Sequence, residues 1–143
     1  MKLSTGKVAF PIEFDNGDKQ TIYFNPNDPD LMIRLKNFTE KTKSRIENIE
    51  DVDLTNEGKP VNVSQIEIFE KMQDILKSEL DYAFGGNISE VVFLHCSPFA
   101  IVNGEFFVIQ FVKAITPEIE KHIAKARADV EKKISKHINK YKK

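Results

Sequence analysis

The side chains best suited to nucleophilic or metal chemistry in this 143-residue sequence are one cysteine and three histidines. Cys96 directly follows His95, and such a pair raises the question of a nucleophile or a metal site. Adjacent residues on a helix point about 100° apart, however, and the sequence offers the pair no clear third partner. We therefore expect structural roles for both, with Cys96 a small buried apolar side chain. His122 and His137 lie fifteen positions apart, too far along one helix to share a metal ion.

The aspartates that lie close together in the sequence fall in turns and at helix starts. They are Asp15 with Asp18, Asp28 with Asp30, and Asp51 with Asp53. Each is explained as a turn former or as a helix N-cap, and none begins a complete calcium-binding loop. The two glycines of segment 84–87 lack the lysine and hydroxyl residue of a phosphate-binding loop. The sequence therefore predicts no enzyme, no catalytic residue, no cofactor and no metal site.

The charge of the chain is unevenly distributed, although its formal net value is only −1. Segment 117–143 holds nine basic and four acidic residues, a net charge of about +5, which leaves about −6 on segment 1–116. A basic helix is typical of contact with nucleic acid or with an acidic partner, but also of a solvated face with cations at a helix C-terminus. Tyr141 is the one aromatic residue there for base stacking. We favour a solvated face or a protein partner over nucleic acid.

Composition narrows the class of protein further. The hydrophobic content of 41% is enough to build a core, and the length suits one domain, with or without an appendage. A single cysteine excludes an internal disulfide framework and a cysteine-rich zinc site. No apolar run reaches the length of about 18 residues that a membrane-spanning helix needs. The first six residues lack an apolar signal core, so we expect a cytoplasmic protein without membrane contact.

The first element expected is a β-hairpin over residues 7–24. Apolar residues alternate along its first strand, the second strand is rich in β-branched and aromatic residues, and Asn16-Gly17 lies between them. Pro11 cannot donate a ladder hydrogen bond, so it should lie on an edge or face outward. Because a lone hairpin is marginal in water, it should pack on helices or extend a sheet, in this chain or in another subunit.

Two amphipathic helices are predicted next, over residues 29–50 and 64–84. Asp28 is the expected N-cap of the first, followed by Pro29 at its first position. A capping box formed by Ser64 and Glu67 opens the second. The polar segment 51–63 between them is expected to be a surface loop.

The most apolar part of the chain, residues 88–115, is expected to be helical. Segment 88–95 suits a short helix or a buried strand, and segment 105–115 also has the β-branched and aromatic content of a strand. The last helix is predicted over 117–143, with Thr116 as N-cap and Pro117 as first helical residue. The predicted class is α+β and mainly α: an N-terminal β-hairpin packed with four to five helices in one globular domain, 1–116, followed by a long basic amphipathic helix.

Two apolar stripes on these helices are candidates for a partner or self-association surface. The stripe on helix 29–50 is narrow, as in a two-helix seam, and that on the last helix extends beyond the width of a small domain. The hypothesised surface residues are Leu31, Leu35, Phe38, Ile123, Val130 and Ile134. Such stripes bind a helical client or seal a homo-oligomer, and we expect an oligomer.

Several segments together resemble a known family. They are Tyr23-Phe24-Asn25-Pro26-Asn27-Asp28-Pro29, Asp81-Tyr82-Ala83-Phe84-Gly85 with Ser89-Glu90, and Pro98-Phe99-Ala100-Ile101-Val102-Asn103-Gly104. With the terminal charged helix, this order is similar to that of the small tail assembly chaperones of phages and prophages of Gram-positive bacteria. The resemblance implies a non-enzymatic protein of the host cytoplasm that binds the tape-measure protein during tail assembly and is absent from the finished particle. Such chaperones often also have a longer, frameshifted product.

Two other classes of function remain open at this point. One is a structural subunit of a phage tail or tail-like particle, which would be retained in the product. The other is a small nucleic-acid-binding regulator that acts through the basic terminal helix, whose binding would weaken steeply with salt.

Overall fold

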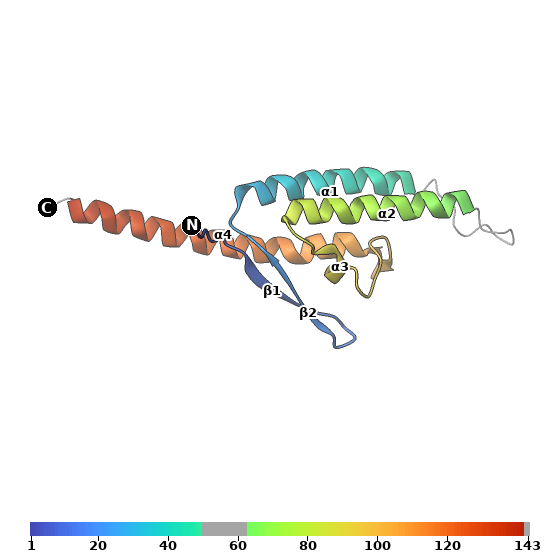
Figure 1. Ribbon diagram of the computed structural model, residues 1–143, viewed down its shortest axis with the longest axis horizontal. Coiled ribbons are helices and arrows are strands. Elements are labelled where there is room, and N and C mark those ends of the chain that lie inside the picture. Colours follow the sequence, from blue (N-terminus) through green and yellow to red (C-terminus); the bar gives the residue numbers. More distant parts are fainter. Residues whose placement is uncertain (50–62, 142–143) are drawn as a thin grey trace.

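The computed structural model describes residues 1–49 and 63–141 and has the expected mainly helical α+β architecture (Figure 1). Its elements, in chain order, are β1 (Val8–Glu13), β2 (Lys19–Phe24), α1 (Pro29–Ile49), α2 (Val63–Phe84), α3 (Ser89–Val92), β3 (Ile101–Val102), β4 (Glu105–Phe106) and α4 (Phe107–Tyr141). The helices α1 and α2 lie side by side over the first half of α4, whose second half projects past the rest of the molecule.

The predicted N-terminal hairpin is present and packs on helices of the same chain. Strands β1 and β2 pair antiparallel, with Phe10 opposite Ile22 and Pro11 opposite Thr21. Pro11 is exposed, as expected for a residue that cannot donate a ladder hydrogen bond. Gly17 has a φ of 90°, which glycine adopts without strain at this turn. Phe24 stacks on Phe10 and meets Phe84 at the end of α2 edge to face, so aromatic contacts hold the hairpin against the helices.

The two central helices begin close to where their sequence signals predict. The Asp28 carboxylate accepts a hydrogen bond of 3.0 Å from the Asp30 backbone N–H, which confirms Asp28 as the N-cap of α1. Helix α2 begins at Val63, one residue before its predicted start. The predicted capping box at Ser64 and most of the predicted loop 51–63 lie outside the described side chains and residues.

The apolar region 88–115 is only partly helical, which corrects the prediction. Helix α3 is four residues long, and a two-stranded hairpin of β3 and β4 follows it. Asn103 and Gly104 both have positive φ, of 52° and 81°, as in a two-residue turn with a left-handed backbone. These two residues interrupt the apolar run because they reverse the chain. Segment 107–115 is helical as expected.

The C-terminal helix begins ten residues earlier than predicted. Helix α4 runs from Phe107 through Pro117 to Tyr141, so Thr116 is not an N-cap and the predicted boundary at 116/117 falls inside a helix. Thr116 instead donates its hydroxyl to the Val112 carbonyl at 2.7 Å. Proline lacks an N–H for the carbonyl four residues before it. Burial of Phe111, Ile115 and Ile119 in the core holds the helix continuous across it.

The hydrophobic core lies where the hairpin, the α1–α2 pair, α3 and the first half of α4 meet. Its largest fully buried apolar side chains include Phe24, Leu31, Leu76, Leu80 and Ile119. Each such side chain contributes roughly 1.5–3 kcal/mol by leaving water. Beyond Ile123, the described side chains of α4 are almost all exposed, so the core places no requirement on the distal half of this helix. Among the described residues, no helix combines the length and apolar character needed to cross a bilayer.

Candidate functional site

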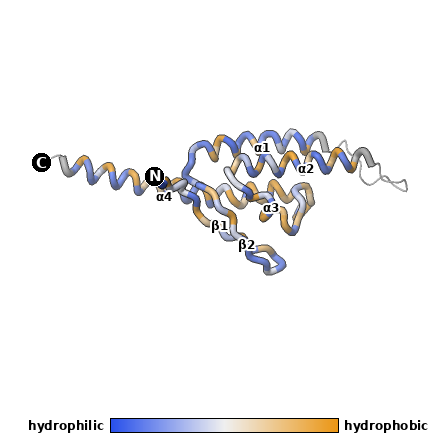
Figure 2. The backbone as a smooth tube through the Cα atoms, viewed as in Figure 1, coloured by the Kyte–Doolittle hydropathy of each residue, from blue (hydrophilic) through white to orange (hydrophobic). Residues whose placement is uncertain are grey.

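The distal half of α4 carries an exposed apolar stripe. Val130, Ile134 and Ile138 follow one another at steps of four and are 55%, 53% and 47% exposed; they are called the α4 stripe below. Figure 2 shows these hydrophobic positions recurring along the projecting helix between hydrophilic ones. Isolated exposed aliphatic residues are ordinary on a protein surface. Three on one face of a helix that projects from the core form a continuous apolar stripe, the feature by which amphipathic helices bind one another.

The α4 stripe continues into a groove at the root of the projecting helix. This groove has a volume of about 600 Å³ and lies between the start of α1, at Pro29 and Met32, and Ile123, Ala126 and Val130 of α4. Ile123 is half-buried and packs against the core, so the surface passes without a break from the core to the free helix. The arrangement resembles the apolar grooves that accept amphipathic helices.

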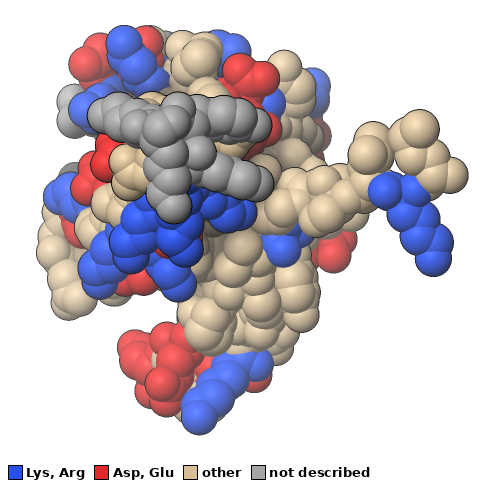
Figure 3. All heavy atoms as spheres, turned by 90° about the vertical axis from the view of Figure 1, so that its left-hand side faces the viewer, with Lys and Arg blue, Asp and Glu red and all other residues tan. Residues whose placement is uncertain are grey.

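Positive charge surrounds the projecting helix. Arg127 lines the root groove together with Asp28 and Glu131, and Lys133 lies beside Ile134 and Ile138 farther out, where no described acidic residue lines the surface. Residues 127–143 include seven basic and two acidic residues. Viewed end-on in Figure 3, Lys and Arg side chains gather below this end of α4, whereas acidic and basic side chains lie together at the tip of the β1–β2 hairpin. A partner helix with acidic residues beside its apolar stripe would match this surface.

The six hypothesised surface residues fall into two groups in the structure. Val130 and Ile134 are exposed and Ile123 is half-buried at the root groove, so these three lie at one candidate surface. Leu31, Leu35 and Phe38 are 1%, 3% and 3% exposed and belong to the core. The prediction that these three form a partner surface is wrong, because α1 uses its apolar stripe to pack on α2 and the rest of the core.

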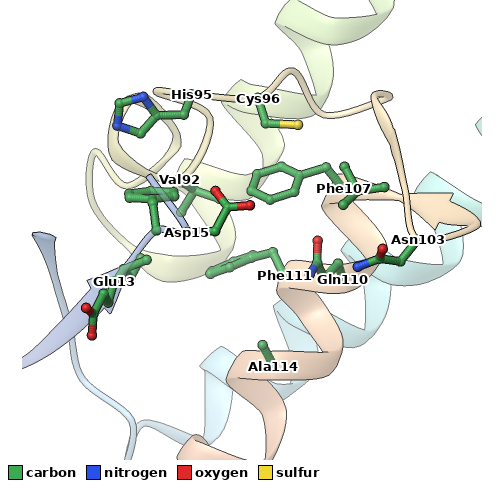
Figure 4. A pocket seen from close by; sticks show the side chains of 13 residues that line it. Glu13, Asp15, Val92, His95, Cys96, Asn103, Phe107, Gln110, Phe111 and Ala114 are labelled. Carbon is green, nitrogen blue, oxygen red and sulfur yellow. The ribbon is translucent and has the colours of Figure 1, made fainter. Parts of the chain in front are cut away.

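A second concave site, the hairpin cleft, lies at the opposite end of α4. It has a volume of about 560 Å³ (Figure 4). It lies between the hairpin tip, the segment after α3, the β3–β4 turn and the first turns of α4. Its lining residues are Ile12, Glu13, Phe14, Asp15, Val92, His95, Cys96, Val102, Asn103, Phe107, Gln110, Phe111 and Ala114. The walls are mostly apolar, and the Asp15 side chain extends over the cleft, whereas Glu13 points away from it.

His95 closes one side of this cleft. Its Nε2 atom lies 2.7 Å from the Asp18 carboxylate, and its ring meets Phe14 edge to face with the centroids 4.8 Å apart. The hydrogen bond from His95 lowers the pKa of Asp18 below its usual value, with a smaller contribution from Gln20. His95 therefore joins the hairpin tip to the segment after α3.

Cys96 is half-buried and not the fully buried side chain expected from the sequence. Partial burial raises the pKa of the thiol above its usual value, and the negative charge of Asp15 raises it further. A thiol with a raised pKa stays protonated at neutral pH, whereas a nucleophilic cysteine needs the thiolate. Since His95 contacts Asp18, the two side chains do not form the hydrogen-bonded pair that activates such a nucleophile. In the part of the chain that the structure describes, no three His, Cys, Asp or Glu side chains are placed to hold a metal ion.

One polar atom in the wall of the hairpin cleft has no partner. The Gln110 side-chain oxygen is buried and accepts no hydrogen bond from the described residues. A buried acceptor without a donor costs roughly 1–3 kcal/mol. The sequence did not predict this cleft, because its walls come from four segments whose proximity is a tertiary result.

The segment 81–89, which carries part of the family resemblance, holds the backbone between α2 and α3 in place. The Asp81 carboxylate accepts hydrogen bonds from the backbone N–H groups of Ile88 and Ser89 at 2.9 and 2.7 Å, and from the Ser89 hydroxyl at 2.8 Å. Gly85 has a φ of 71°, the left-handed conformation that ends a helix. These residues fix the turn from α2 to α3.

The candidate sites are therefore two surfaces suited to binding, the α4 stripe with its root groove and the hairpin cleft. Comparison of the chain with family models, with curated proteins and with solved structures finds no match.

Proposed function

We propose that this protein is a non-enzymatic assembly chaperone that binds an aggregation-prone helical client through the α4 stripe and its root groove. The observation that carries the proposal is the projecting α4, whose three half-exposed aliphatic residues have no packing role in the described chain. The sequence resemblance to phage tail assembly chaperones supplies the class of client, the tape-measure protein of a phage tail.

The chemistry of the surface suits such a client. A tape-measure protein is long, helical and hydrophobic in the family that the sequence resembles, so its apolar stripes need cover before assembly. A helix that lays its apolar face along Val130, Ile134 and Ile138 would bury side chains on both partners. Arg127 and Lys133 beside the stripe favour client segments with acidic flanks.

The direct test asks whether this protein keeps a tape-measure protein soluble. The client in this test is the tape-measure protein that the proposal expects in the same genome, co-expressed with the wild-type protein or with Ile134→Glu. We expect the wild-type protein to hold the client in solution and to co-purify with it, and Ile134→Glu to lose both, because a carboxylate would be desolvated in the contact. Ile33→Glu is the matched control, since Ile33 is 59% exposed on α1, away from the stripe. Equal client solubility with Ile134→Glu and wild type would refute the use of this surface.

A structural subunit would use the same surface but stay in the particle. Mass spectrometry of purified particles separates the two roles. A chaperone is absent from the finished particle, whereas a subunit is present in fixed stoichiometry.

A further inference from the structure

The two candidate surfaces are opposite in charge and lie at opposite ends of one helix. Lys133 lines the outer part of the α4 stripe, where no described acidic residue does, and Arg127 and Glu131 both line its root. The Asp15 carboxylate extends over the hairpin cleft, the Glu13 carboxylate points away from it, and no lysine or arginine is among the described lining residues of the cleft. We propose that the α4 stripe of one molecule docks in the hairpin cleft of a second copy, so that the protein associates head to tail.

The cleft matches the stripe in size and polarity. Its volume of about 560 Å³ falls within the range of roughly 300–1,000 Å³ that ligand pockets occupy, so it takes in aliphatic side chains such as those of Ile134 and Ile138. Phe107, Phe111 and Ala114 of α4 give it an apolar floor.

Asp15 carries most of the uncompensated charge in the cleft. Lys19 lies opposite Glu13 in the hairpin register, and Asp18 is engaged by His95. Asp15 forms no ion pair with any described residue, and its side chain extends over the cleft (Figure 4). The lysines around the α4 stripe would supply the missing counter-charge.

The geometry requires that this contact be intermolecular. Gln110 and Ile134 are 24 positions apart on the continuous helix α4, which at about 1.5 Å per residue separates them by about 36 Å. A straight helix cannot fold its end back onto its own beginning. Because the two surfaces differ, the contact is heterologous, and successive copies build a ring if the rotation closes and an open chain if it does not.

The same contact would protect the surface to which the proposed function assigns client binding. In the free protein the stripe would be covered by a sister cleft, and a client helix would displace it. The inference nevertheless concerns only copies of this chain and does not depend on the client's identity.

The test uses two variants that each block one surface. Ala114→Arg places a bulky cation in the cleft, and Ile134→Glu places a carboxylate in the stripe; both parent residues are exposed. Sedimentation velocity should show concentration-dependent oligomers for the wild type, weakened by salt, and loss of association for each variant alone. An equimolar mixture should form a one-to-one dimer and nothing larger, because the free stripe of Ala114→Arg fits the free cleft of Ile134→Glu. Ala128→Arg and Ile33→Glu are matched controls on exposed residues outside both surfaces and should oligomerise as the wild type does.

Three results would overturn the inference. They are a monomeric wild type at every concentration, self-association of Ala114→Arg, as expected if stripes pair with each other, and failure of the mixture to associate. The proposed function is tested by a separate measurement, the solubility of the client. Ala114→Arg keeps its stripe, so it should still solubilise the client, and loss of client binding by Ile134→Glu is measured whether or not the copies associate.

Discussion

At the scale of single residues, Asp81 links two helices through three hydrogen bonds. Its carboxylate accepts from two backbone N–H groups and one hydroxyl at the start of α3, and hydrogen bonds to a charged group contribute more than neutral ones. We expect Asp81→Ala to lower the free energy of unfolding by about 2 kcal/mol. Urea denaturation measures this, with Asp74→Ala on the exposed face of α2 as control. A change as small as that of the control would show that the α2–α3 turn holds without this carboxylate.

The ion pair between Arg45 and Glu79 ties α1 to α2 and gives stability a dependence on pH. Both guanidinium Nη atoms reach the carboxylate, Nη2 at 2.7 Å. The hydrogen bonds from Arg45 lower the pKa of Glu79 below its usual value, against the opposing effect of burial. A lowered folded-state pKa means that the pair stabilises the fold above the unfolded-state pKa of 4.5 and loses this contribution as pH falls through the folded-state value.

The variant Glu79→Gln tests the direction of this dependence of stability on pH. At pH 7 it should lower the free energy of unfolding by about 1 kcal/mol, the scale of a partly exposed bidentate pair. The difference from the wild type should shrink as the pH is taken below 4.5, because the wild-type carboxyl then also loses its charge. Denaturation series at several pH values measure both. A difference that is constant across the pH range would mean that the pair contributes by packing and not by charge.

At the scale of elements, α4 retains a proline in its interior. An interior proline costs about 3 kcal/mol in a helix, offset by a smaller gain of about 0.4–1 kcal/mol from restricting the unfolded chain. We therefore expect Pro117→Ala to raise the free energy of unfolding by about 2 kcal/mol, measured by urea denaturation. Pro117 is exposed, so the change removes no core contact. A destabilised variant would indicate that the proline sets a bend on which the core packing depends.

The same helix shows why some elements are predictable from sequence and others are not. Helices α1 and α2 have clear periodicity, and Asp28 at the start of α1 acts as the local signal predicts. The start of α4 does not follow its local signal. Thr116-Pro117 has the form of a helix start, but burial of Phe111 and Ile115 keeps the helix continuous across these two residues. In segment 88–106 almost every residue is apolar or a turn former, so periodicity gives no way to choose between helix and hairpin.

The candidate sites, like the elements, are only partly predictable from the sequence. An apolar stripe predicts that a helix face is covered, but not by what. Leu35 is covered by the chain's own core, whereas Ile134 is left exposed. The distinction depends on where α4 leaves the body, which is a tertiary property. The charge asymmetry, in contrast, was visible in the sequence, and in the structure the basic segment coincides with the projecting half of α4.

At the scale of the whole molecule, the core and the proposed binding surface lie in separate parts of the chain. From Arg127 to Asn139 every described side chain is exposed, so this part of α4 makes few contacts within the described fold. We expect a chain that ends after Ala128 to unfold within about 1 kcal/mol of the full-length protein, the range of changes confined to a surface. Urea denaturation and circular dichroism check that the body is intact.

The truncated chain should nevertheless lose both proposed interactions. It lacks Val130, Ile134 and Ile138, and most of the positive charge that complements Asp15, so it should sediment as a monomer and fail to solubilise the client. Its cleft remains, however, so it should bind the stripe of a full-length molecule and cap a growing assembly. Adding it in excess to the wild type should shift the oligomers to smaller sizes. If the truncated chain leaves the size distribution of the wild type unchanged, the cleft is not the receptor for the stripe. If it still oligomerises alone, the surface that joins the copies lies in the body, and the distal helix serves only the client.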